Sequence, residues 1–182
     1  MTETSERNYT VRTKINKPVA EVFNAIVSGE QSTKYFVNAT TGDMVEGTKV
    51  AWTWDEYGTN EVTIKKVVDN ELIQLGLDSE NWQKTNDDSY EVTVSFEFEA
   101  LDDRSTMVSI SESGWRHDAE GYKGSHDNCG GWQDFLLCLK GYLEYGIDLR
   151  KYLQLFVSCG ALGHTIIGCP FLFVQKFLCL AS

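Results

Sequence analysis

Residues 130–144 read GGWQDFLLCLKGYLE. Apolar side chains recur there every three or four positions, which is the period of one face of a helix. The apolar stripe consists of Trp132, Phe135, Leu136, Leu139, Leu143 and Ile147. The polar positions, which we expect to face solvent, are Gln133, Asp134, Lys140 and Glu144. We therefore predict one long helix near residues 128–150, capped by Asp127 or Asn128, with its apolar stripe in the core.

The chain before this helix alternates apolar and polar residues, which is typical of half-buried strands. The clearest case is residues 89–101, where Tyr90, Val92, Val94, Phe96 and Phe98 share one face. Further strands are predicted at residues 9–15, 49–55, 60–68, 72–77 and 106–113. Because short turns join most of them, we predict an antiparallel sheet with one covered face.

Two short helices are predicted after the first strand. Pro18 suits a first helical residue because proline has no N–H to lose, and Val22 and Ile26 follow at helical spacing. We place these helices at residues 18–28 and 30–36. The order of strand, two helices, about six strands and a long helix predicts the α+β class. We expect a curved antiparallel sheet wrapped around the long C-terminal helix.

Composition limits the range of partners. The chain has 182 residues, which suits one main domain, and its formal net charge of −11 opposes nucleic-acid binding. The N-terminal residues are polar and charged, unlike a secretory signal. The five cysteines are an odd number, so we predict reduced thiols, a cytoplasmic location and an acidic, soluble protein.

The C-terminal tail differs from the rest, and we predict a boundary between residues 1–152 and 153–182. Lys176 is the only charged residue of the tail, which holds three cysteines. The uncharged stretch Leu153–Val174 is long enough to span a bilayer, but several glycines interrupt it. Three interpretations stay open: an apolar segment packed on the domain or a partner, a membrane anchor, or an extension without an evolved role. Membrane contact is expected only through this tail.

Four segments carry a resemblance to a known family. They are residues 15–26 (INKPVAEVFNAI), 47–52 (GTKVAW), 114–115 (GW) and 130–144. Over about residues 8–150 the chain resembles the START-like, or SRPBCC, helix-grip superfamily. It is most similar to the AHSA type, represented by the C-terminal domain of the activator of the heat-shock chaperone ATPase. The resemblance implies a cavity between the sheet and the long helix, which relatives use for apolar molecules. Some relatives are cyclases or lyases, and others bind the chaperone.

The function predicted from these features is binding of a small apolar or amphipathic ligand in that cavity. Pockets for such ligands have aromatic walls and few polar groups. We expect the lining to comprise Phe36, Trp52, Trp54, Phe96, Trp115, Trp132 and Leu136. Two alternatives stay open. One is a protein-interaction module that binds a chaperone or another protein. The other is a cyclase-like or lyase-like enzyme using polar groups of residues 115–129.

Residues 115–129 form the stretch richest in polar side chains. We predict a mobile loop there, with His117, Tyr122 and His126 at the mouth of the cavity. Their spacing matches no standard zinc site, and the chain has neither a P-loop nor a nucleophile elbow. We therefore predict no metal, no cofactor and no catalytic residue, and binding rather than catalysis.

Overall fold

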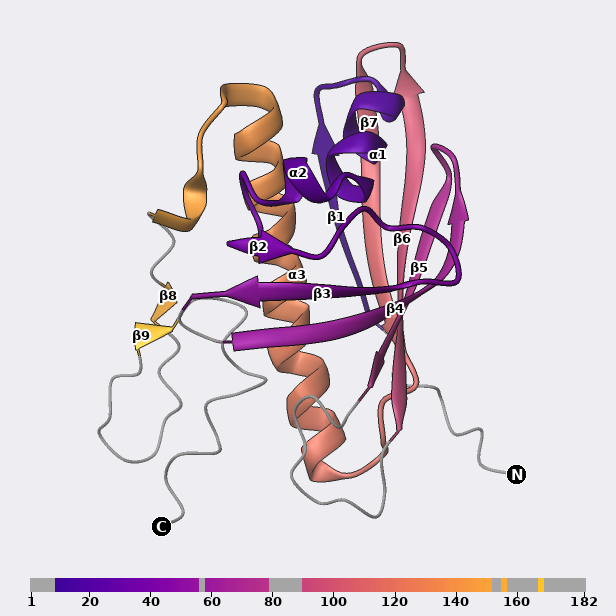
Figure 1. Ribbon diagram of the computed structural model, residues 1–182, viewed down its shortest axis with the longest axis vertical. Helices are drawn as coiled ribbons and strands as arrows, with labels where there is room; N and C mark the ends of the chain where they lie inside the picture. The colour runs from indigo at the N-terminus through magenta and orange to yellow at the C-terminus, as the bar shows by residue number, and fades with distance from the viewer. Residues whose placement is uncertain (1–8, 56–57, 79–89, 152–154, 157–166, 169–182) are drawn as a thin grey trace.

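The computed structural model describes residues 9–55, 58–78, 90–151, 155–156 and 167–168 (Figure 1). Seven strands form one antiparallel sheet in the order β1-β7-β6-β5-β4-β3-β2. They are β1 (Tyr9–Ile15), β2 (Ala39–Thr40), β3 (Lys49–Trp54), β4 (Gly58–Val68), β5 (Leu72–Asp78), β6 (Glu91–Asp102) and β7 (Ser105–Ser113). The helices are α1 (Val19–Val27), α2 (Gly29–Ser32), α3 (Ala119–Tyr145) and the short 3₁₀ turn η2 (Leu149–Lys151). The predicted α+β helix grip is confirmed.

Period-two alternation places one face of the sheet against the core. In β6, Val92, Val94 and Phe96 are fully buried, while Thr93 and Ser95 between them are half-buried. Hairpins connect β3 to β4, β4 to β5, β5 to β6 and β6 to β7. The first strand, β1, pairs with β7 at the edge of the sheet. The predicted strands are confirmed, and the sequence pattern missed only the two-residue β2 among those in this sheet.

Two details of the early helices differ from the prediction. Pro18 precedes α1 as its N-cap rather than forming its first residue. The second helix, α2, ends at Ser32, because the backbone turns there and carries Tyr35, Phe36 and Val37 into the core. The Ser28 hydroxyl caps α2 by accepting a hydrogen bond from the N–H of Gln31 at 3.3 Å.

Helix α3 begins earlier than predicted. Its N-cap is Asp118, whose Oδ1 accepts a hydrogen bond from the N–H of Gly121 at 2.7 Å, so Asp127 and Asn128 lie inside the helix. Tertiary packing stabilises these glycine-rich turns, since a Cβ on Gly124 would lie 2.5 Å from the Trp115 ring. The helix ends at Tyr145, followed by Gly146 in the left-handed region. Ile147 is therefore outside the helix and exposed, contrary to the prediction.

The polar positions of α3 were also expected to face solvent, and this was wrong for three of them. Lys140 Nζ donates to the carbonyl of Lys14 at 2.7 Å, and Glu144 Oε1 accepts from the N–H of Asn16 at 2.6 Å. Asp134 is 6% exposed. For Lys140 and Glu144 the reason is that α3 lies close along β1, so this flank of the helix meets the strand and the residue after it.

Most of the C-terminal tail lies outside the described residues. Its described part is a pair of two-residue strands, β8 (Leu155–Phe156) and β9 (Ile167–Gly168), which are antiparallel to each other. Within the described residues, no helix combines the length and apolar character needed to cross a bilayer. The domain boundary and the three interpretations of the tail stay predictions.

Candidate functional site

Six aromatic rings meet between α3 and the sheet, and we call them the aromatic cluster. They belong to Phe36, Trp52, Trp54, Phe96, Trp132 and Phe135, and each residue is at most 6% exposed. The ring of Phe36 lies edge-on to those of Trp52, Trp54 and Phe135, with centroids 4.9–5.4 Å apart. Phe96 contacts Trp132 at 5.4 Å and Phe135 at 5.7 Å. Phe135 therefore joins the two halves of the cluster.

The strand and helix periods bring these rings together. Trp52 and Trp54 share a face of β3 because they are two positions apart, and Phe96 points inward from β6. Trp132 and Phe135 are three positions apart on α3, so they share a helix face. Trp54 Nε1 donates to the carbonyl of Phe36 at 2.9 Å, which fixes the segment after α2 against β3.

The backbone of α3 lies closest to β1, at one edge of the sheet. β3 lies near the opposite edge, and in Figure 1 it crosses the axis of the helix. Large aromatic side chains, rather than close backbone packing, therefore connect α3 with β3. Because α3 diverges from the sheet in this way, large side chains are needed to fill the interior between the helix and β3.

Six of the seven expected lining residues lie in this common core, where Leu136 is fully buried beside the rings. Trp115 is the exception. Its ring lies against Gly124 and, at 6.4 Å between centroids, beside Tyr90, next to the first turns of α3. Phe135 was expected in the helix stripe but not as a lining residue, although its spacing from Trp132 was a usable signal.

A buried carboxylate borders the aromatic cluster. Glu112, at the end of β7, is 1% exposed and accepts hydrogen bonds from Trp132 Nε1 at 2.5 Å, Trp115 Nε1 at 2.8 Å and Asn128 Nδ2 at 3.1 Å. Burial raises the pKa of Glu112, and these donors oppose that shift. The buried Tyr9 hydroxyl approaches the same carboxylate; burial, and next the Glu112 charge, raise the pKa of Tyr9.

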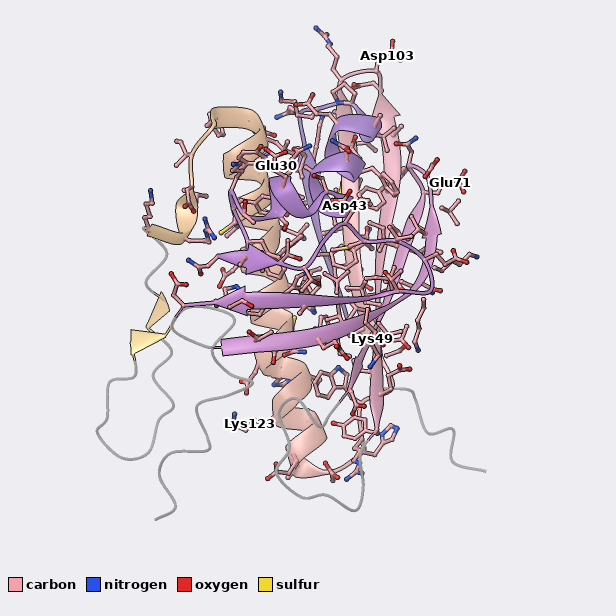
Figure 2. All side chains as sticks on the ribbon, viewed as in Figure 1. Glu30, Asp43, Lys49, Glu71, Asp103 and Lys123 are labelled. Atoms are coloured by element: carbon pink, nitrogen blue, oxygen red, sulfur yellow. The ribbon has the colours of Figure 1, made fainter. Side chains whose placement is uncertain are left out.

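Sequence reasoning did not single out Glu112. The available signal was its place in the alternation of β7, on the inward face with Val108 and Ile110. Glu112 contrasts with the six charged residues labelled in Figure 2, among them Glu71 and Asp103, all of which are exposed. A charged residue at an inward strand position needs hydrogen-bond donors, and two tryptophans and an asparagine provide them.

A second buried carboxylate, Asp134 on α3, has a different environment. Its Oδ2 has no hydrogen-bond partner among the described residues. Burial raises the pKa of Asp134 to about 6. A carboxylate without a partner in the interior opposes folding, and such groups are often found at functional sites.

The three polar residues expected at a cavity mouth do not meet the aromatic cluster. His117 is exposed just before α3, and Tyr122 and His126 are exposed on the helix, their rings 4.2 Å apart. The expected loop is instead helical from Ala119 onward, so that part of the prediction was wrong. In the described part of the chain, no group of three or more His, Cys, Asp or Glu side chains could hold a metal ion.

Comparison with known proteins agrees with this architecture. The family model described as Activator of Hsp90 ATPase homolog 1-like protein matches residues 16–144. The chain belongs to this family. The match confirms the AHSA-type resemblance, and it spans the chain from the end of β1 almost to the end of α3, including the whole aromatic cluster.

Solved structures of two other proteins have the same fold as this chain. The protein SSP2350 from Staphylococcus saprophyticus is 24% identical, with a TM-score of 0.63 over 79% of this chain and 96% of that one. The Aha1 dimer from Colwellia psychrerythraea is 22% identical, with a TM-score of 0.63 over 76% of this chain and 97% of that one. At these identities the likeness establishes the fold alone. None of the curated proteins matches the chain.

Proposed function

We propose that the chain binds a small apolar or amphipathic molecule between α3 and the sheet, at the aromatic cluster. The observation that carries this proposal is the meeting of six buried rings from β3, β6, α3 and the segment after α2. Buried aromatic walls contributed by several elements are typical of sites for such ligands.

The contacts within the cluster favour an apolar occupant. Trp54 Nε1 is bonded to the Phe36 carbonyl, and Trp132 Nε1 is bonded to Glu112, so both indoles already donate within the protein. What these rings offer a ligand is their faces and edges. An aromatic or aliphatic body that separates Phe36 from Phe135 would gain the ring contacts that these residues now make with each other.

The alternative functions have less support from the described residues. The exposed positions of His117 and His126 count against a cyclase-like or lyase-like mechanism that uses polar groups of residues 115–129. The family description names activation of a chaperone ATPase, and binding of a chaperone or another protein stays an alternative.

Binding of 2-methylnaphthalene, an apolar probe, tests the proposal. We expect isothermal titration calorimetry to show saturable binding to the full chain, together with a higher melting temperature. Trp54→Phe shortens a ring inside the cluster and should weaken binding. Trp115→Phe changes a buried tryptophan outside the cluster and serves as the matched control. Failure of this probe and of its polar analogues naphthalene-2-methanol and naphthalene-2-methylamine to bind would overturn the proposal, as would equal weakening by both variants.

A further inference from the structure

The two flanks of α3 have different neighbours. Its central face, with Trp132 and Leu139, lies against the core. A helix turns about 100° per residue, so Lys140 and Glu144 fall on one flank and Asp134 on the other. The bonds of Lys140 and Glu144 to β1 identify the first flank as the one beside that strand.

The flank that carries Asp134 lies on the side of the aromatic cluster away from β1. Phe135 and Tyr142 lie between the central face and this flank. They contact Phe36 at 4.9 Å and Tyr35 at 5.5 Å, residues of the segment after α2. The Asp134 side chain therefore leaves the helix about 100° further around than that of Phe135, on the flank away from β1.

The turn of α3 before Asp134 contains two glycines. Helical side chains lean toward the N-terminus of the helix, so Asp134 leans over the turn that holds Gly130 and Gly131. Neither glycine has a side chain, and a Cβ on Gly130 would meet nothing within 4 Å. Gly130 is exposed, so this turn is open on its solvent side, and the two glycines place no side chain over Asp134.

Hydrogen bonding separates Asp134 from the other buried carboxylate. Glu112 is bonded by three side-chain donors, whereas Asp134 Oδ2 has none among the described residues although the residue is 6% exposed. The raised pKa of Asp134, about 6, has burial as its cause and reflects the same lack of a donor. A donor brought by a ligand would satisfy this group.

We propose that Asp134 is the polar anchor of the ligand site and accepts a hydrogen bond from a hydroxyl or ammonium group of a ligand whose apolar part lies in the aromatic cluster. This inference rests on the proposed function and narrows its ligand class to apolar molecules with one donor group.

Three naphthalene probes of one shape test the anchor: 2-methylnaphthalene, naphthalene-2-methanol and naphthalene-2-methylamine. At pH 8 we expect the full chain to bind the alcohol and the amine about tenfold more tightly than the hydrocarbon, the factor expected of a hydrogen bond to a charged group. Asp134→Leu should abolish both preferences. Asp134→Asn should abolish the preference for the amine and keep part of that for the alcohol. Glu144→Gln, a carboxylate change on the β1 flank, should keep both preferences.

The possible results separate the two proposals. Equal binding of all three probes to the unmodified chain overturns the anchor and leaves the proposed function standing. Binding of none overturns the proposed function and the anchor together. The melting temperature without probe gives an independent readout. If the Asp134 carboxylate has no partner within the protein, Asp134→Leu should have a melting temperature equal to or higher than that of the unmodified chain. A strongly lowered value would assign Asp134 a partner within the protein and overturn the anchor.

Discussion

Glu112 and Trp132 are joined by a hydrogen bond of 2.5 Å between Oε1 and Nε1, which links the end of β7 to the middle of α3. The same indole belongs to the aromatic cluster, where it contacts Phe96 and Phe135. The orientation of the Trp132 ring is thus set from two sides, by a buried charge and by apolar packing. Changes at Glu112 should reach the proposed ligand site through this ring.

Removing the Glu112 carboxylate should lower stability strongly. Glu112→Ala removes the buried acceptor shared by the donors of Trp115, Asn128 and Trp132, and we expect a loss of about 3 kcal/mol or more in the free energy of unfolding. Urea unfolding followed by tryptophan fluorescence measures it. Glu97→Ala, an exposed carboxylate change on neighbouring β6, should stay within about 0.5 kcal/mol of the parent. Equal effects of the two changes would contradict the structural role of Glu112.

Stability should depend on pH through Asp134. Its pKa of about 6 in the folded chain lies above the ordinary value of 3.8, so the folded state holds the proton more tightly than the unfolded state. The contribution of this group is therefore most favourable below about pH 4 and is lost as pH rises through about 6. We expect the parent to gain stability relative to Asp134→Asn when pH falls from 7.5 to 4.5. Because Glu112 is present in both chains, its titration cancels in the difference, and a constant difference would refute the assignment.

Two glycines of α3 should respond oppositely to alanine. Gly130→Ala adds a Cβ that meets nothing within 4 Å and should stabilise the chain by about 0.5–1 kcal/mol through helix propensity. Gly124→Ala places its Cβ 2.5 Å from the Trp115 ring and should destabilise the chain despite the same gain in propensity. Thermal melts followed by circular dichroism compare the pair. A shift of the same sign in both would contradict the packing of Trp115 on the helix.

Arg150 should hold the end of the domain in place. Its guanidinium donates to the carbonyls of Val37 at 2.7 Å and Thr33 at 3.1 Å, and it is paired with Asp148 at 2.9 Å. Arg150→Ala should cost about 1–2 kcal/mol and increase hydrogen exchange in the segment after α2. Lys151→Ala, at the exposed neighbouring position, is the control and should leave exchange unchanged. Unchanged protection in the Arg150 variant would show that this contact does not restrain the segment.

The parts of the fold that the sequence predicted are those with strong periodicity. Two local signals in the sequence agree with the structure. They are the alternation in β6 and the helical spacing of Trp132, Phe135, Leu136 and Leu139. The start of α3 could not be predicted in this way, because Gly121 and Gly124 argue against a helix. The Trp115 ring, which comes from outside the helix, makes glycine necessary at position 124.

The site was predictable in its apolar part and not in its polar part. Large aromatic residues on inward faces mark the interior regardless of partners. Glu112 and Asp134 are acidic. From sequence alone an acidic residue is predicted to be exposed, unless its hydrogen-bond donors or the groups that bury it are known. Those donors come from another element, as Asn128 and Trp132 do for Glu112.

The pairing of β1 with β7 has a consequence for how the chain acquires its fold. Tyr9 lies opposite Glu112, and Lys14 and Asn16 are bonded to Lys140 and Glu144 of α3. During synthesis on the ribosome, β1 is therefore made before β7 and α3, with which its residues form these contacts. Contacts so distant along the chain slow folding, and they leave the edge of β1 open to other nascent chains in the meantime. The last step of folding should thus be the joining of the two ends of the domain.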